Sequence, residues 1–278
     1  MAEPLVCEEL WNEIEPLIPK HLPDPRGGKP RKDDRPCLEG IVHVLRTGTQ
    51  WQRLPRCDLW PSGSTCWRRF TEWTRLGVWT QLHRRLLNLL GVQGAVDLET
   101  VVVDSASVRA KKGGSHTGPS PVDRAKNGCK RHIITEADGT PLIVVCTPGN
   151  IRDDTPFLAM LDSTPPVKMP VGPPRYLPGT IVGDAAYGQT FIIPRVIERR
   201  IIPLLAPRSM PGRPVKHGSG LGRVRYVVER TIAWLGSFRR IERCYEQTGS
   251  AWQTMNELAC CVICAGKLQK LNCTRMAA

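Results

Sequence analysis

The sequence has no long apolar run and no segment that resembles a secretory signal. Its first residues, MAEPLVCEELW, lack the basic and apolar regions of a signal peptide. Nowhere does it approach the roughly 20 consecutive apolar residues that a membrane-spanning helix needs. These absences exclude a secreted and a membrane-spanning protein, so we expect a soluble protein located in the cytoplasm.

Regularly spaced cysteines are also missing. The chain has 11 cysteines, an odd number without a disulfide framework, and an intracellular setting would keep them reduced. Only Cys261 and Cys264 have C-x-x-C spacing, with no second pair and no nearby histidine, which is weak support for a zinc site. We expect them, with Cys260, to pack in the core of a C-terminal helix.

Acidic residues are few relative to basic ones. The chain has 39 Lys and Arg against 26 Asp and Glu, which gives a formal net charge of +13. Such an excess favours a polyanionic partner, most often nucleic acid, with an anionic membrane surface as the alternative. With 278 residues and an ordinary apolar fraction of 41%, the chain can form one large domain or two modest ones.

The first 95 residues predict helices. Apolar residues at helical spacing indicate helices over 7–17, from residue 37 to at least 45, from Ser62 or Ser64 to 76, and over 78–90. Between them, the basic Pro- and Gly-rich stretch 21–36 is either a solvated linker or an arm that contacts DNA. Glycines at positions 91 and 94 suggest a boundary, so we expect a helical domain over 1–95 and a second domain over 96–278.

The third of these helices is rich in arginine. Its large apolar residues fall on one side, which leaves Arg68, Arg69 and Arg75 to face outward. A helix, a turn and an Arg-rich helix are the ingredients of a helix-turn-helix DNA-binding unit. The same pattern is common in ordinary helical domains, so it does not establish DNA binding alone.

After the boundary, two short apolar runs lead to acids. Val101 to Val103 form a β-branched run that predicts a buried strand, and Asp104 follows it. In the same way, the run at 181–182 leads through Gly183 to Asp184. A carboxylate at the end of a buried strand needs a donor, a basic group or a metal ion as partner. Helices and strands alternate after this point, as in α/β folds.

A third acid lies on a later helix, predicted from about residue 224 to 241. Glu229 stands beside an apolar stripe on this helix, with Arg225 one turn before it. An ion pair between these two residues is the structural alternative. Together, however, Asp104, Asp184 and Glu229 could bind two divalent cations such as Mg²⁺, which support in-line displacement at phosphorus.

Four segments carry a resemblance to a known family: VVVDSASVRA, VDRAKNGCKRHIITEADGTPLIVVCTPGNIRDD, IVGDAAYG and GRVRYVVERTIAWLGSFRRIERCYE. In this order they are similar to the bacterial DDE transposases of the insertion-sequence five group. The resemblance implies an α/β fold, a ribonuclease-H-like mixed sheet flanked by helices, preceded by a small all-α helix-turn-helix-like domain. It also implies that Asp104, Asp184 and Glu229 are the catalytic metal ligands, with Mg²⁺ as cofactor and Mn²⁺ able to substitute.

The implied partner is double-stranded DNA. By this resemblance the helical domain would bind the terminal inverted repeats of the element, and the second domain would cleave DNA and join 3′ ends to target DNA. Joining two ends suggests at least a homodimer on DNA. Candidate phosphate contacts are Lys130, Arg131, His132 and Arg225.

The sequence departs from the family pattern at two positions. Gly222 and Gly236 stand where many members have Tyr and Lys, so Arg239 or Arg240 is the candidate for the DNA contact that the Lys would make. Asn150 and Asp153 match a recurrent Asn-x-x-Asp element that could support the site or cap the following helix. Two other functions stay open: an inactive, transposase-derived DNA-binding regulator, and a metal-dependent DNA nuclease without strand transfer.

Overall fold

The computed structural model describes residues 4–21, 30–206 and 221–277, and in the last range it describes side chains from residue 226 to 276. Its N-terminal part is helical, as predicted. The helices are α1 (Glu8–Ile14), α2 (Asp34–Thr47), α3 (Gly63–Arg75) and α4 (Val78–Val92), with short 3₁₀ helices η1 (Glu15–Leu17) and η2 (Trp51–Arg53). The central part of the arm predicted over 21–36 lies outside the described residues, as do residues 207–220.

Close packing determines where α3 begins. A Cβ atom at Gly63, the first residue of α3, would lie 1.7 Å from the carbonyl oxygen of Trp51, so only glycine fits there. Further along α3, Phe70 and Trp73 are buried against the Trp79 ring of α4, with ring centroids 6.0 and 5.6 Å away. These aromatic contacts fix α3 on α4 and leave the opposite face of α3 to solvent.

Six strands form one mixed sheet: β1 (Thr100–Arg109), β2 (Gly118–Pro119), β3 (Asn127–Glu136), β4 (Pro141–Pro148), β5 (Thr180–Gly183) and β6 (Ile202–Leu205). The main order is β4, β3, β1, β5, β6, and the short β2 also pairs with β3. Strand β3 runs antiparallel to both β1 and β4, whereas β5 is parallel to β1 and to β6. Three antiparallel strands followed by two parallel ones make a ribonuclease-H-like sheet, which confirms the expected fold class.

The strand that carries Asp104 is longer than predicted. We expected the strand to stop at this acid, but β1 continues to Arg109 and pairs with β3 as far as Gly128. Asp104 lies opposite Ile133, in the middle of β1. The prediction was wrong because the polar residues after Asp104 satisfy their backbone groups on β3, a partner that the local apolar pattern does not reveal.

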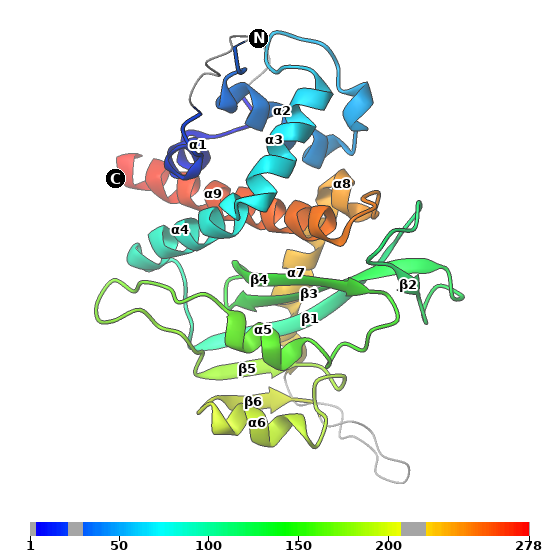
Figure 1. The fold of residues 1–278 in the computed structure, drawn as a ribbon. Helices are drawn as coiled ribbons and strands as arrows, with labels where there is room; N and C mark the ends of the chain where they lie inside the picture. Colours follow the sequence, from blue (N-terminus) through cyan, green and yellow to red (C-terminus); the bar gives the residue numbers. More distant parts are fainter. Residues whose placement is uncertain (1–3, 22–29, 207–220, 278) are drawn as a thin grey trace.

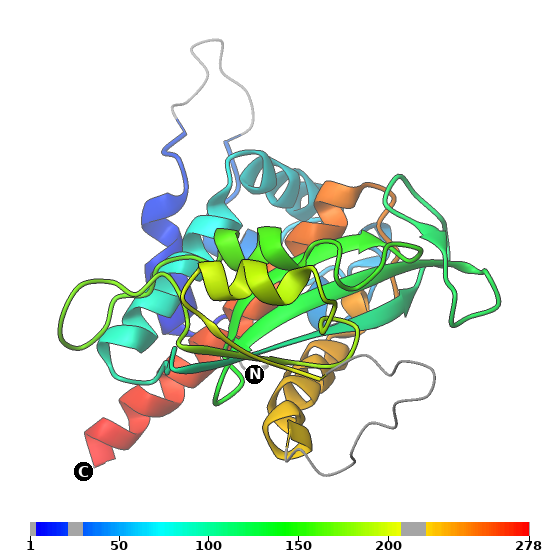
Figure 2. The same cartoon turned by 90° about the horizontal axis from the view of Figure 1, so that it is seen from below.

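Helices cover both faces of the sheet. In Figures 1 and 2, α5 (Phe157–Ser163) and α6 (Ile192–Glu198) lie over one face and α7 (Leu221–Ser237) over the other. The helix predicted to run to residue 241 is divided: α7 ends at Ser237, and α8 (Arg239–Glu242) follows. Phe238 between them has an extended backbone (φ −79°, ψ 101°), which interrupts the helical hydrogen-bond ladder.

The last helix, α9 (Gly249–Ala277), runs between the N-terminal helices and the sheet (Figure 1). Toward α4, the Glu257 carboxylate accepts a hydrogen bond from Thr80 at 3.1 Å. Toward β4, Gln253 accepts a bond from the Cys146 amide and donates one to the Val144 carbonyl, both at 2.8 Å. The described buried apolar residues form one continuous core from both parts of the sequence.

The cysteines of α9 are part of this core. Cys260, Cys261 and Cys264 are all fully buried, and burial raises the pKa of each thiol. The expected packing role is confirmed. Among the described helices, none is long and apolar enough to cross a membrane.

A buried histidine also joins the two parts of the sequence. The Nε2 atom of His83 on α4 lies 2.8 Å from the Pro141 carbonyl oxygen at the start of β4. Burial lowers the pKa of His83 from its ordinary value of 6.5 to about 4. The ring is therefore neutral near pH 7, and its Nε2–H donates to the carbonyl.

Candidate active site

The pairing of β1 with β5 brings two aspartates to neighbouring positions. The parallel register pairs Val102 with Val182, and Asp104 and Asp184 each follow two residues later. Both carboxylates are half-buried. Asp184 lies immediately after β5, where its Oδ1 accepts a hydrogen bond from the Ala186 amide at 2.8 Å. Two acids that are far apart in the sequence therefore lie at adjacent strand positions.

The negative charges around these aspartates affect the pKa of a buried tyrosine, Tyr187. Tyr187 packs edge-on against Phe157, with ring centroids 5.2 Å apart. Burial raises the pKa of its hydroxyl, and the charges of Asp153, Asp104 and Asp184 raise it further. The negative charges of three carboxylates therefore all act on the Tyr187 hydroxyl.

The third predicted acid is more exposed. Glu229 lies on the solvent side of α7, next to Val228, which is buried. Successive strand residues face opposite sides of a sheet, so Asp104 lies on the face opposite to Ser105. Because Ser105 contacts Asp153 before α5, Asp104 lies on the α7 side. Glu229 is therefore on the helix that covers the Asp104 face.

A divalent ion is compatible with the two aspartates. Mg²⁺ is usually bound by one or two carboxylates, with waters and substrate phosphate completing its shell. In the part of the chain that the structure describes, no three His, Cys, Asp or Glu side chains are grouped closely enough to hold a metal. Glu229 is thus not grouped with the two aspartates, and the adjacent pair Asp104 and Asp184 would supply the first ligands of such an ion.

Among the predicted phosphate contacts whose side chains the structure describes, Lys130 alone lines a cleft beside Asp184. The cleft has a volume of about 420 Å³. Its lining includes Lys130, Asn150, Arg152, Asp153, Ala185, Ala186 and Gln189. The Lys130 ammonium lies 3.0 Å from Asp153 Oδ1. Ala185 and Ala186 directly follow Asp184, so the cleft adjoins the second aspartate.

Two neighbours of Lys130 were predicted wrongly as phosphate contacts. Arg131 is buried and donates to the Asn256 side chain of α9 at 3.2 Å. His132 is fully buried against Thr147, and burial lowers its pKa to about 4, so it is neutral near pH 7. Their basic character favoured a contact with phosphate, but β3 is a central strand whose side chains are covered on both faces.

Two other predicted DNA contacts are also buried in ion pairs. Arg69 does not face outward: its guanidinium donates to Asp34 at 2.9 Å and to Glu72 at 3.3 Å. Arg240 is buried with Glu246, at 2.6 Å. Asp34 lies on α2 and Glu246 beyond a break in the helix, so helical spacing could not identify these two partners, whereas Glu72 lies three residues after Arg69 on α3.

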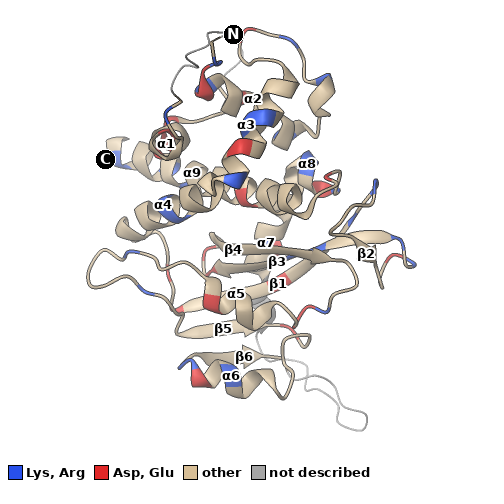
Figure 3. Ribbon diagram, in the orientation of Figure 1, with Lys and Arg blue, Asp and Glu red and all other residues tan. Residues whose placement is uncertain are grey.

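The remaining basic candidates differ in what the structure describes. Arg68 and Arg239 are exposed. The side chain of Arg225 lies outside the described residues. Lys and Arg residues also occur in the loops around β2, at one end of the sheet, where they are drawn in blue in Figure 3.

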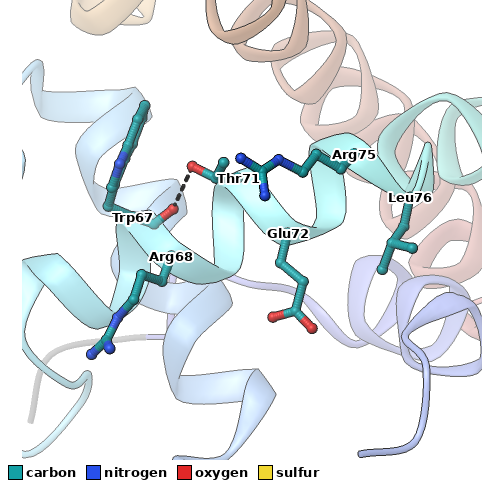
Figure 4. Close-up of a pocket in the computed structure, with 6 residues that line it drawn as sticks. All are labelled: Trp67, Arg68, Thr71, Glu72, Arg75 and Leu76. Carbon is teal, nitrogen blue, oxygen red and sulfur yellow. Dashed lines mark hydrogen bonds between the residues drawn. The ribbon is translucent and has the colours of Figure 1, made fainter.

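The solvent face of α3 is hollowed. A cavity of about 470 Å³ is lined by residues of this helix and by the residue directly after it: Trp67, Arg68, Thr71, Glu72, Arg75 and Leu76. Figure 4 shows these side chains along successive turns, with the Thr71 hydroxyl bonded to the Trp67 carbonyl at 2.9 Å. Arg68 and Arg75 are exposed, so the predicted outward orientation is confirmed for both.

Asp153 has a different role from a helix cap. Helix α5 begins at Phe157, with Pro156 at its N-cap position. Instead, Asp153 Oδ1 accepts hydrogen bonds from the Ser105 hydroxyl at 2.6 Å and from Lys130 at 3.0 Å. Burial raises the pKa of Asp153, but these two donors lower it, and the net pKa lies below its ordinary value.

Sequence reasoning missed Ser105 and Tyr187 as neighbours of the site. Each lies within three residues of a predicted acid: Ser105 follows Asp104, and Tyr187 follows Asp184 by three. Their position beside the acids was visible in the sequence. What the sequence could not indicate is that the Ser105 hydroxyl donates to Asp153 and that the charge of Asp153 acts on the Tyr187 hydroxyl.

Two family profiles match this chain. Residues 6–83 match proteins assigned as transposases of the IS4/5 family, and residues 97–264 match the transposase DDE domain. A Burkholderia cepacia protein assigned as the transposase for insertion sequence element IS402 is 39% identical over 156 residues, covering 56% of this chain and 72% of the relative. An uncharacterized 16.2 kDa protein of element IS402 from the same organism is 41% identical over 123 residues, covering 44% of this chain and 84% of the relative.

A solved structure with detectable similarity is the Mos1 transposase paired-end complex with the left transposon end. It is 13% identical, and the alignment covers 88% of this chain and 82% of that chain, with a TM-score of 0.25. So low a TM-score supports no inference about fold or function.

Proposed function

This chain belongs to the DDE transposases of the IS4/5 type, and from that premise we propose that it binds the terminal inverted repeats of its own insertion sequence, cleaves DNA there and joins the 3′ ends to target DNA. DDE transposases are enzymes that cut and join DNA with divalent metal ions. Both steps are phosphoryl transfers, so one site serves both.

The single observation that carries the proposal is the adjacency of Asp104 and Asp184. Their strands pair in parallel, and both side chains follow the last paired residues by two positions. In the proposed mechanism these carboxylates hold divalent ions, Mg²⁺ with Mn²⁺ able to substitute, and Glu229 of α7 completes the ligand set. When bound, the ions would activate the attacking oxygen and stabilise the leaving oxygen.

The remaining residues bind and orient DNA. Lys130, in the cleft beside Asp184, contacts a phosphate close to the cleaved bond, while Arg68 and Arg75 on the exposed face of α3 contact the duplex. Arg239 is exposed on α8 and extends the basic surface. Residues 1–95 recognise the element ends, and residues 96–278 carry out the chemistry. The chain acts as a homodimer or larger assembly, since two element ends have to meet.

The test is the variant Asp184→Asn. It keeps the size of the side chain but removes the charge that a divalent ion needs, so Mg²⁺-dependent cleavage of an end-containing duplex should be lost. Binding of the same duplex in EDTA should persist, measured by gel shift. The matched control is Asp162→Asn on α5, where the acid pairs with Arg199 at the surface. This substitution should leave the cleavage rate unchanged.

Cleavage by Asp184→Asn at the rate of the control would contradict the proposed ligand role. Strand transfer is measured separately, as joined products with a supplied target duplex. Cleavage without joined products would restrict the activity to that of a DNA nuclease.

A further inference from the structure

Three separate segments meet at Asp153. One carboxylate oxygen, Oδ1, accepts the Ser105 hydroxyl from β1 at 2.6 Å and the Lys130 ammonium from β3 at 3.0 Å. Asp153 itself comes from the turn before α5. These bonds tie together the strand that carries Asp104 and the strand that carries Lys130.

This network lies next to the second aspartate, on the face of the sheet opposite to the Asp104 carboxylate. Ser105 directly follows Asp104 on β1, and the cleft that Lys130 and Asp153 line is also lined by Ala185, directly after Asp184. The charge of Asp153 reaches the Tyr187 hydroxyl together with the charges of both aspartates. A purely structural ion pair would not need to lie at this cleft.

The Lys130 side chain has little freedom and one carboxylate partner in the network. It is 9% exposed, whereas Asp153 is 27% exposed. An ammonium group has three N–H donors, and the contact with Asp153 uses one. A cation held in this way at a cleft can reach a phosphate oxygen without a search through lysine rotamers, which are numerous for a free side chain.

We propose that Asp153 is a positioning residue of the DNA-cleaving site, which holds Lys130 at the cleft for a phosphate of the bound DNA strand and is itself anchored by the Ser105 hydroxyl. This inference rests on the proposed function and adds a fourth acid to it, one that acts through Lys130. Asp153 contributes orientation, and Lys130 makes the contact with DNA.

The test is a double-mutant cycle with Asp153→Asn and Lys130→Met. Each single variant should cleave saturating end-containing duplex about 10- to 100-fold more slowly, the scale expected when a catalytic arrangement is displaced by about 1 Å. If Asp153 acts through Lys130, the double variant should be no slower than Lys130→Met alone. Asp162→Asn serves again as the control for loss of an ion-paired acid.

A second measurement separates positioning from simple charge. In EDTA, Lys130→Met should bind the duplex more weakly and lower the slope of log affinity against log salt by about 1, since one phosphate contact is lost. Asp153→Asn should bind at least as tightly as wild type, because an acid near the DNA is removed. Slow cleavage despite tight binding is the signature of lost orientation.

Several outcomes would overturn the inference. One is an Asp153→Asn protein that cleaves as fast as the Asp162→Asn control. Another is a double variant that is slower than Lys130→Met by the same factor by which Asp153→Asn alone is slower than wild type. If Asp153→Asn does not fold, Ser105→Ala removes one of the two bonds, and the same cycle is run with it. When wild type cleaves and Asp184→Asn does not, failure of the cycle rejects this inference alone. A wild-type protein that does not cleave rejects the proposed function and this inference with it.

Discussion

Two arginines in this chain form ion pairs in very different surroundings. Arg240 and Glu246 are both 6% exposed, and the guanidinium contacts one carboxylate oxygen at 2.6 Å and 2.7 Å. Arg199 and Asp162 form an equally short pair, at 2.6 Å, but their side chains are 25% and 51% exposed. At the scale of single residues, burial rather than distance determines what each pair contributes to stability.

We expect Arg240→Ala to lower the free energy of unfolding by about 3–5 kcal/mol, because it leaves the Glu246 carboxylate buried without its partner. Arg199→Ala should cost less than about 1 kcal/mol, since water screens the exposed pair and solvates the remaining acid. Urea unfolding followed by circular dichroism measures both. Equal losses in the two variants would contradict the assignment of Arg240 as a structural residue.

The same distinction separates the basic residues that are able to meet DNA from those that are not. Arg68 and Arg69 are neighbours on α3, yet only Arg68 is exposed, because Arg69 turns toward Asp34 of α2. Along β3, Lys130 reaches the cleft, whereas Arg131 is held under α9 by Asn256. Basic residue type alone therefore does not identify a DNA contact.

At the scale of elements, the spacing of β1, β5 and β6 depends on one glycine. A Cβ atom at Gly183 would lie 2.9 Å from Val103 Cγ1 and 3.0 Å from Leu205 Cδ2, both in buried side chains. Gly183 also immediately precedes Asp184. The close approach of these strands and the position of the second aspartate therefore have the same local cause.

We expect Gly183→Ala to lower the free energy of unfolding by about 1–3 kcal/mol, because the added methyl group overpacks the strands. It should also slow DNA cleavage by shifting Asp184 relative to Asp104. The matched control is Gly266→Ala in α9, where a Cβ would meet nothing within 4 Å. That variant should gain up to about 1 kcal/mol from helix propensity.

Thermal unfolding and the duplex cleavage assay check both variants. A Gly183→Ala protein as stable as Gly266→Ala would show that the strands move apart at no cost.

At the scale of the whole molecule, α9 joins parts of the chain that are remote in sequence. It is bonded to α4 through Glu257 and Thr80, and to β4 through Gln253 and the backbone of residues 144 and 146. His83 of α4 adds a direct bond to Pro141. The N-terminal helices and the sheet therefore stabilise one another through the last helix.

We predict that the full chain unfolds in one cooperative transition. Differential scanning calorimetry should give a calorimetric enthalpy equal to the van't Hoff enthalpy. A fragment ending at residue 95 lacks α9 and should show no cooperative transition, because the buried side chains of α4 lose their cover. Two resolved transitions in the full chain, or a fragment with its own sharp transition, would contradict this view.

Much of the architecture was predictable because its causes are local. Apolar spacing identified the helices of the N-terminal part, and β-branched runs identified β1 and β5. The dipeptide Asp138-Gly139 is a hairpin turn signal, and it lies between β3 and β4, where Gly139 has φ 83°. The two aspartates were recognisable because each ends an apolar run. Side-chain periodicity and backbone preference act over a few residues, so the order of amino acids carries them directly.

Contacts between distant segments were decided only in three dimensions. The continuation of β1 past Asp104 depends on β3, and the burial of Arg69, Arg131 and Arg240 depends on Asp34, Asn256 and Glu246. The link from Lys130 through Asp153 to Ser105 joins residues 23 and 48 positions apart. Neither periodicity nor charge specifies such partners, because the energy of a buried polar group depends on whichever group the completed fold brings beside it.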